Sequence, residues 1–352
     1  MPLCVMSRED KHMKKMNRIM KMQIFWPAVI LLLILLFNGI ISGGSFFEIK
    51  IVDHHLFGRL IDIFRNGSKL MILAIGMTLV LATGGTDISV GSVMAISGAI
   101  ACSIVSGRLL PGAGGNVAVA ILLAILAGIA SGAWNGFLVS KIKIQPIVAT
   151  MILMVAGRGI AQLITRGKIV TINSQAYYFI NGGYILSIPF PVFIVAFALV
   201  LAMLFTRKTA FGMFIEATGC NPVAGSFSGV HVDAVKFLVY TCSGAMAAVA
   251  GLIESAGIKG ADCNNAGLLI ELDAILAVAI GGTSLNGGRF SIPASILGAL
   301  IIQSITTTVY AVGIAPEITQ VIKAVLVIFI CLFQSPEFKA SLISKIRIRK
   351  VA

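Results

Sequence analysis

Long apolar runs separated by short polar stretches dominate the chain. Most are about 17–25 residues long, the length at which a helix crosses a hydrocarbon layer of ~30 Å. The pattern predicts ten membrane-spanning helices. Their expected ranges are 24–42, 68–83, 89–106, 117–140, 146–164, 190–206, 236–256, 272–283, 291–312 and 318–334.

Composition supports a membrane protein. Of the 352 residues, 58% are hydrophobic and only 12% are charged, whereas a soluble domain carries roughly 25% charged residues. The basic N-terminus followed by an apolar run resembles a secretory signal. However, that run is about 18 residues long, longer than a signal's apolar core, and no clear cleavage site follows. We therefore expect an uncleaved first span in an all-α polytopic membrane protein.

The basic residues predict the orientation. Seventeen of the 27 Lys and Arg residues fall on the side that holds both termini, against eight on the other side. Since Lys and Arg concentrate on cytoplasmic loops, both termini are expected to be cytoplasmic. The net charge of +13 is explained in this way, without a nucleic-acid partner. The expected organisation is a basic extension (1–23), a transmembrane domain (24–335) with an inner loop (206–235), and a basic tail (336–352).

Two glycine-rich stretches interrupt the apolar pattern. "GGTDISVG" (Gly84–Gly91) resembles "GGTSLNGG" (Gly281–Gly288), and both fall on the cytoplasmic side of the predicted topology. They are either an internal repeat of the kind found in transporters or two glycine-rich turns. Glycine breaks helices, and backbone groups freed in this way must face protein or water. Asp87 either serves function within the membrane or caps the next helix from a wet surface.

Other charged residues lie within or beside the spans. Arg158 and Lys323 either line a transport path or extend to the membrane surface. Glu271 and Asp273 open the short eighth span, where carboxylates suit the positive end of a helix. The six cysteines show no spacing typical of metal ligands.

The inner loop contains "GMFIEATGCNPVAGSFSG", which is too polar to span the membrane. It predicts a short helix along the cytoplasmic face that docks a soluble partner, with a mobile loop as the alternative. The chain has no GxxxxGK[ST] phosphate-binding loop, no HExxH and no GxSxG motif. We therefore expect no enzymatic activity and no cofactor in this chain.

Three stretches together resemble a known family: "LAIGMTLVLATGGTDISVGSVMAISGA", "TRKTAFGMFIEATGCNPVAGSFSGV" and "ELDAILAVAIGGTSLNGGRF". They are similar to the permease subunits of bacterial carbohydrate ABC importers of the ribose, xylose and arabinose group. The resemblance covers roughly residues 60–335. Within that group, "KIQPIVATMILMVAGRGIAQLIT", "KGADCNNAGLLIELDAILAV" and "GALIIQSITTTVY" are most similar to galactofuranose importers.

The resemblance implies roles for individual residues. The family's inner loop seats in the ATPase subunit, and it matches here at Gly212, Glu216, Ala217, Gly219 and Asn221. One departure is that Pro222 directly follows Asn221, where a proline alters the local helix. The translocation pathway is assigned, together with Arg158, to Gly84, Gly85, Asp87, Ser89, Gly91, Glu271, Gly281 and Gly282.

The expected function is import of a monosaccharide, a furanose or hexose or a pentose, across a bacterial inner membrane. The expected partners are a second permease chain, identical or related, cytoplasmic ATPase subunits that bind ATP and Mg²⁺, a periplasmic sugar-binding protein and the lipid bilayer. The alternative is a secondary transporter driven by ions or protons, with Asp87, Arg158 and Lys323 as relays. A passive channel is a third hypothesis.

Overall fold

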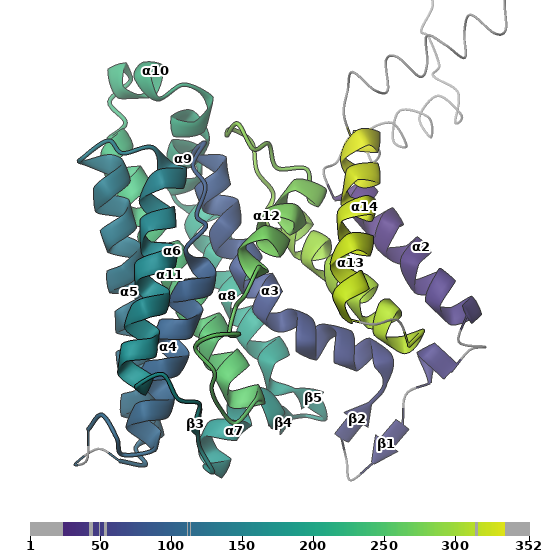
Figure 1. Cartoon of the computed structure of the whole chain (residues 1–352). Coiled ribbons are helices and arrows are strands. Elements are labelled where there is room, and N and C mark those ends of the chain that lie inside the picture. Colours follow the sequence, from purple (N-terminus) through teal and green to yellow (C-terminus); the bar gives the residue numbers. More distant parts are fainter. Residues whose placement is uncertain are drawn as a thin grey trace, which may run out of the picture.

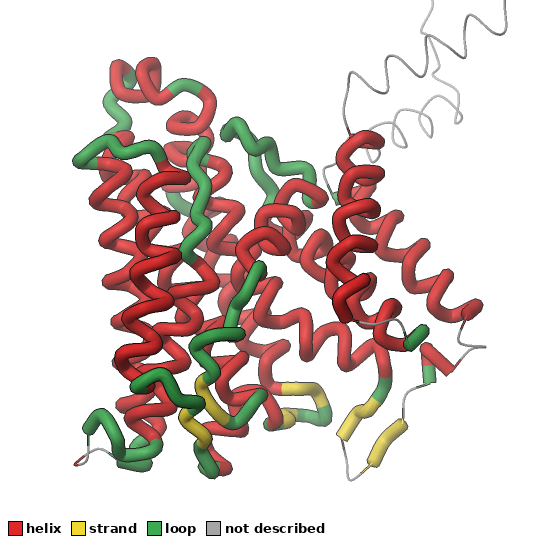
Figure 2. The backbone as a smooth tube through the Cα atoms, in the orientation of Figure 1, coloured by secondary structure: helices red, strands yellow, loops and turns green. Residues whose placement is uncertain are grey.

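The computed structural model describes residues 24–41, 45–48, 50–52, 55–110, 112, 114–313 and 316–334. The predicted basic extension (1–23) and tail (336–352) lie outside the described residues. Among the described residues the fold is helical, with thirteen α-helices, one short 3-10 helix and six strands of two or three residues. Figure 2 shows how little of the backbone is strand.

The first half of the chain is mostly long helices, with one 3-10 helix and two short strands near its start. It consists of α2 (Phe25–Ile41), η1 (Ser45–Phe47), β1 (Lys50–Val52), β2 (His55–Phe57), α3 (Arg59–Ala82), α4 (Val90–Val105), α5 (Val117–Ser140) and α6 (Pro146–Thr165).

The second half is more interrupted. It consists of β3 (Val170–Thr171), α7 (Gln175–Gly182), β4 (Tyr184–Ile185), β5 (Ile188–Pro189), α8 (Phe190–Lys208), α9 (Phe211–Cys220), α10 (Pro222–Phe227), α11 (Val232–Gly257), β6 (Gly260–Ala261), α12 (Ile270–Ile280), α13 (Ile292–Ala311) and α14 (Pro316–Gln334).

Every one of the ten predicted ranges contains a helix: α2, α3, α4, α5, α6, α8, α11, α12, α13 and α14. By length and apolar composition, six of these helices could cross a membrane: α3, α5, α6, α8, α11 and α13. Helices α2 and α4 are apolar but shorter, and α12 has only 11 residues. The all-helical fold class is therefore confirmed, with six candidate spans among the described residues.

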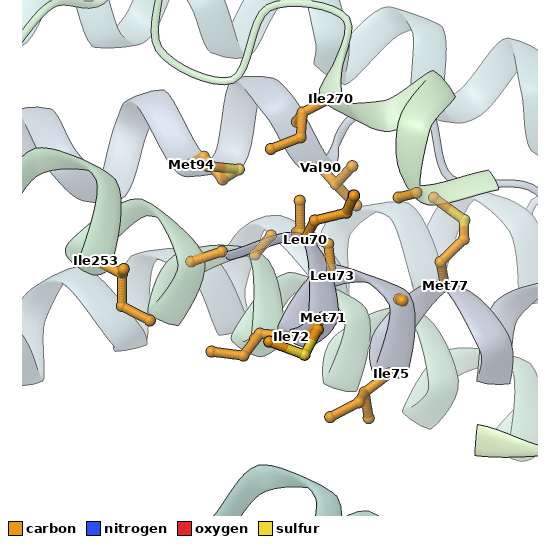
Figure 3. Close-up of a cluster of buried hydrophobic side chains, with 14 of the residues drawn as sticks. Leu70, Met71, Ile72, Leu73, Ile75, Met77, Val90, Met94, Ile253 and Ile270 are labelled. Atoms are coloured by element: carbon orange, nitrogen blue, oxygen red, sulfur yellow. The ribbon is translucent and has the colours of Figure 1, made fainter. Parts of the chain in front are cut away.

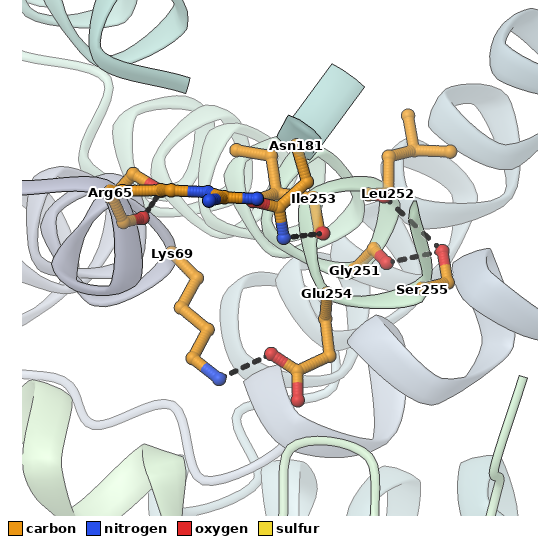
Figure 4. Close-up of polar contacts among 9 residues, drawn as sticks. Arg65, Lys69, Asn181, Gly251, Leu252, Ile253, Glu254 and Ser255 are labelled. Carbon is orange, nitrogen blue, oxygen red and sulfur yellow. Dashed lines mark hydrogen bonds and ion pairs between the residues drawn. The ribbon is translucent and has the colours of Figure 1, made fainter. Parts of the chain in front are cut away.

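Helix α3 begins at Arg59, well before the predicted start at residue 68. Its first turns mix apolar and polar residues, and the side chains of Arg65 and Lys69 contact neighbouring helices (Figure 4). Lys69 Nζ forms an ion pair with Glu254 Oε2 on α11. Arg65 Nε donates to Asn181 Oδ1 at 3.3 Å, and Asn181 Nδ2 donates to the Ile253 carbonyl oxygen at 3.0 Å. These polar contacts extend the helix beyond its apolar run.

Helix α3 forms the centre of the bundle. Its apolar side chains Leu70, Met71, Ile72 and Leu73 are buried with Val90 and Met94 of α4, Ile253 of α11 and Ile270 of α12 (Figure 3). Small residues bring α5 and α11 into close contact, since a Cβ atom at Gly136 would lie 2.8 Å from the Phe237 carbonyl oxygen. Such contacts gain van der Waals energy where lipid offers no hydrophobic drive.

The two ends of the bundle differ. Helices α9 and α10 lie at one end, whereas the β3, β4 and β5 strands lie at the other (Figure 1). Strand β3 pairs with β6, which links the segment after α6 to the segment after α11. The two ends therefore carry different structures.

Candidate transport and coupling sites

Three segments distant in sequence meet through their backbones. The Gly288 N–H donates to the Ala82 carbonyl oxygen at 2.9 Å. A Cβ atom at Gly219 of α9 would clash with that same carbonyl oxygen and lie 2.5 Å from the Gly288 nitrogen. A Cβ atom at Gly287 would lie 2.9 Å from the Gly84 nitrogen. We name this contact of Ala82, Gly84, Gly219, Gly287 and Gly288 the glycine junction.

The glycine junction connects the end of α3, the loop between α12 and α13, and helix α9. It thus brings together Gly84, Gly219 and the stretch after Gly281, which were predicted from separate motifs. The left-handed backbone falls at Gly84 alone in the first stretch, and at Gly282, Gly287 and Gly288 in the second. The two stretches are therefore alike in composition but differ in backbone path.

The flanking glycines also allow close packing. A Cβ atom at Gly85 would lie 2.5 Å from the Tyr240 hydroxyl, which donates to the Thr86 carbonyl oxygen at 3.2 Å. A Cβ atom at Gly281 would lie 2.6 Å from the Ser295 nitrogen on α13.

Asp87 is the centre of a buried hydrogen-bond network. Its side chain is 1% exposed. Oδ1 accepts from the Ser89 N–H at 3.0 Å and the Ser89 hydroxyl at 2.6 Å, and Oδ2 accepts from the Ser243 hydroxyl at 2.8 Å. Asn135 Nδ2 donates to the Ser89 hydroxyl at 2.8 Å. Asp87 therefore joins the start of α4 to α11 and α5. It accepts the Ser89 N–H at the start of α4, as the capping alternative expects, but it does so from a buried position and not from a wet surface.

Arg158 secures an irregular segment. Its Nη1 donates to the carbonyl oxygens of Cys263 at 3.0 Å and Ala266 at 2.6 Å. Both belong to the loop 258–269, which runs from α11 to α12. Within the bundle such loop backbone must be satisfied by protein groups, and the guanidinium group supplies donors.

The first turns of α4 and α12 meet beside this loop. Glu271 is 7% exposed, and its Oε2 has no hydrogen-bond partner among the described residues. A Cβ atom at Gly91 would lie 2.7 Å from that oxygen and would clash with the Gly267 carbonyl oxygen. The carboxylate thus lies where two helix N-termini converge, a position that favours negative charge.

Lys323 of α14 pairs with a carboxylate of a neighbouring helix. Its Nζ forms an ion pair with Asp273 Oδ2 of α12 at 2.8 Å. Asp273 therefore connects α12 to α14 in addition to lying in the first turn of α12.

The predicted inner helix is two short helices. Asn221 ends α9, and its Oδ1 caps α10 by accepting from the N–H groups of Val223 and Ala224, both at 3.0 Å. Pro222 takes the first position of α10, where its missing N–H costs nothing. Ala217 contributes its carbonyl oxygen to the Asn221 N–H at 3.1 Å. Pro222, placed directly after Asn221, therefore separates α9 from α10 at a corner.

Two further predicted residues line a cavity of about 330 Å³ beside α9. Gly212 and Glu216 lie on its wall with Arg207 of α8 and Phe290 and Pro293 near the start of α13. Glu216 and Gly219 belong to the same helix, so the cavity and the glycine junction are linked by α9.

The predicted residues thus fall into separate groups. The glycine junction holds Gly84 and Gly219, and the buried network holds Asp87 and Ser89. The α4–α12 contact holds Gly91 and Glu271, beside the loop that Arg158 binds. Sequence reasoning missed Ser243 and Tyr240 as partners of the aspartate segment. The available signal was their polar side chains within the apolar range 236–256.

The chain matches the family described as "Branched-chain amino acid transport system / permease component" over residues 59–331. It belongs to that family and is therefore a membrane permease component. It is 50% identical to the galactofuranose transporter permease protein YtfT of Escherichia coli K12, over 92% of this chain and 94% of that one.

Two other relatives are similar over most of the chain. The fructose import permease protein FruF of Bifidobacterium longum is 43% identical, over 80% of this chain and 79% of that one. The ribose import permease protein RbsC of Escherichia coli K12 is 36% identical, over 77% of this chain and 83% of that one. No solved structure matches the chain.

Proposed function

We propose that this chain is the membrane-spanning permease of an ATP-binding-cassette importer that carries a monosaccharide into the bacterial cytoplasm. The observation that carries the proposal is 50% identity over nearly the full length to a galactofuranose permease. Other relatives are named for fructose and ribose, which favours a furanose-type or pentose sugar. Energy comes from ATP and Mg²⁺ in a partner subunit, and this chain forms the path.

The proposed topology has ten spans and two cytoplasmic termini in the inner membrane. It is supported by the excess of basic residues on the side assigned to the cytoplasm. Helices α9 and α10 then face the ATPase, and the end with β3 and β6 faces the periplasm and a sugar-binding protein. A second permease chain completes the path.

The proposed coupling runs through α9. A ligand shifts two conformations only by its differential affinity for them, so ATP must act through a physical connection. Closure of the ATPase moves Glu216 and, through the glycine junction, the ends of α3 and α12. Helix α12 carries the movement to Glu271 and the loop held by Arg158. The coupling residues are Gly212, Glu216, Ala217, Gly219 and Asn221. The residues that line the path are Gly84, Gly85, Asp87, Ser89, Gly91, Arg158, Glu271, Gly281 and Gly282.

The ion-driven alternative is not supported by the relatives. Moreover, Lys323 is held by Asp273 and Arg158 by two carbonyl oxygens.

The test is uptake of labelled galactose, fructose and ribose by liposomes that hold the full complex. We expect uptake to require ATP and the ATPase and to stop with vanadate. Uptake that persists without the ATPase and stops with a protonophore would contradict the proposal.

Glu216→Lys tests the coupling role. We expect a folded, membrane-inserted protein with abolished uptake, because the reversed charge lies on the face of α9 that meets the cavity. Asp62→Lys is the matched control, since it makes the same charge change at the exposed start of α3. Normal uptake by Glu216→Lys would remove the coupling assignment.

A further inference from the structure

Helix α6 carries two polar residues on an otherwise apolar exposed face. Val155 is 67% exposed and Leu163 is 79% exposed, which suits lipid or a partner chain. Arg158 and Gln162, four residues apart on the same face, both turn to the loop 258–269. Gln162 Nε2 donates to Asn264 Oδ1 at 2.7 Å, and this bond is exposed. A polar strip therefore runs along the contact between α6 and the loop.

The loop side of this strip is held in a fixed shape. Asp262 Oδ1 accepts from the N–H groups of Asn264 at 3.1 Å and Asn265 at 3.4 Å. Asp262 Oδ2 accepts from Asn265 Nδ2 at 2.8 Å. The Asn265 side chain chiefly holds the pKa of the Asp262 carboxyl below its usual range, with smaller effects from the backbone N–H groups and the Arg158 charge. The carboxylate is thus ordered and ionised.

The strip continues inward to an oxygen that lacks a partner. Arg158 Nη1 donates to the carbonyl oxygen of Ala266 at 2.6 Å, and the next residue of the loop, Gly267, lies with Glu271 Oε2 against Gly91. Glu271 is 7% exposed, with Oε2 unpartnered among the described residues. A buried acceptor without a donor costs free energy, and a ligand hydroxyl would remove that cost. We name Arg158, Gln162, Asp262, Asn264 and Glu271 the polar seam.

The chemistry of the polar seam selects its ligand. The Asp262 carboxylate disfavours an anion, and the Arg158 guanidinium group disfavours a cation. An amide has two donor hydrogens and an acceptor oxygen with two lone pairs, so the bond between Gln162 and Asn264 leaves each side chain with further capacity. Alternating donors and acceptors fit a neutral molecule with several hydroxyl groups.

We propose that the polar seam binds the sugar as it enters the permease, with Gln162, Asn264 and Asp262 at the entrance and Glu271 deeper. This inference rests on the proposed function and names residues that bind the substrate. The entrance lies on the side of the bundle that carries β3 and β6, since β6 immediately precedes Asp262. The sugar is handed inward past Arg158, which anchors the loop by its Nη1 bonds.

The experiment uses the full complex in liposomes, with the binding protein saturated with galactose, fructose or ribose. The variants are Gln162→Ala and Asn264→Ala. Gln145→Ala is the matched control, because it removes an exposed amide from the opposite end of α6. Sugar transported and ATP hydrolysed are measured together. We expect sugar transported per ATP to fall about fivefold in each seam variant, as for loss of one hydrogen bond, with ATP hydrolysis unchanged.

The isosteric variant Asn264→Asp guards against a folding defect. It keeps size and removes the donor hydrogens, so it should also lower transport per ATP and alter the order of preference among the three sugars. Unchanged transport per ATP in the seam variants would overturn the proposal. So would a parallel fall of uptake and ATP hydrolysis, which indicates a structural role. Failure of the proposed function itself is distinguishable, since the unaltered complex would then show no ATP-dependent uptake.

Discussion

At the residue scale, Gly219 leaves no room for added volume. Gly219→Ala would place a methyl group against the Ala82 carbonyl oxygen and 2.5 Å from the Gly288 nitrogen. Because both neighbours are backbone, relief requires a chain shift, and we expect a cost of about 1–3 kcal/mol. Thermal unfolding in detergent measures this cost, and liposome uptake measures the expected loss of coupling.

Gly225→Ala is the control for this substitution. Its Cβ would lie 3.7 Å from the Ala217 carbonyl oxygen, which is ordinary contact. Alanine is also the better helix former by up to ~1 kcal/mol, so stability should hold or rise. Equal behaviour of the two variants would show that the glycine junction is not tightly packed.

Asp87 offers a second prediction at this scale. Asp87→Ala removes the acceptor for three donors on Ser89 and Ser243, and each buried donor left unpaired costs about 1–3 kcal/mol. We expect a strongly lowered unfolding midpoint. Asp87→Asn keeps one oxygen and should lose less, with transport retained. Loss of transport at full stability in Asp87→Asn would instead indicate a proton relay.

The sequence revealed which residues matter more readily than how they meet. A carboxylate among glycines between two apolar runs was a sufficient signal for Asp87. Its acceptance of a hydrogen bond from Ser243 was not predictable, because that pair is separated by 156 positions. The glycine junction depends likewise on distant segments, and no local pattern indicates that Gly219 and Ala82 touch.

At the element scale, α12 is tied at both ends. Its C-terminus leads into the glycine junction, its first turn contacts α4, and Asp273 binds Lys323 of α14 at 2.8 Å. We expect a coupling energy of about 1 kcal/mol between these two side chains. A double-mutant cycle of Asp273→Ala and Lys323→Ala, followed by thermal unfolding, measures it. Strictly additive effects would contradict a contribution from the pair.

Element positions followed well from apolar runs, and element ends did not. The runs predict where helices lie because their length matches a bilayer. The early start of α3 escaped this reasoning, since Arg65 and Lys69 are polar and gain partners only from α7 and α11. The corner between α9 and α10 was signalled by the pair Asn221 and Pro222, whose capping chemistry is local.

At the scale of the whole molecule, the proposed orientation places α9 in the cytoplasm. Cys220 is an exposed free cysteine at the end of this helix. In a variant that keeps only this cysteine, a membrane-impermeant maleimide should leave Cys220 unmodified in spheroplasts and modify it in inverted vesicles. Asn173→Cys in the same background, near β3, is the control and should show the opposite pattern. Reversed labelling of both sites would invert the topology.

The glycine junction also bears on how such importers can diversify. The glycine junction is a contact between main-chain atoms, so no side-chain rotamer change can take up a displacement there. It also does not depend on which side chains flank it. The residues on the surface of α9 and α10 that contact a partner can therefore change one at a time, while the backbone contacts of the glycine junction are preserved. Replacement of one ATPase subunit by another then requires changes only on the surface of α9 and α10, and none in the glycine junction.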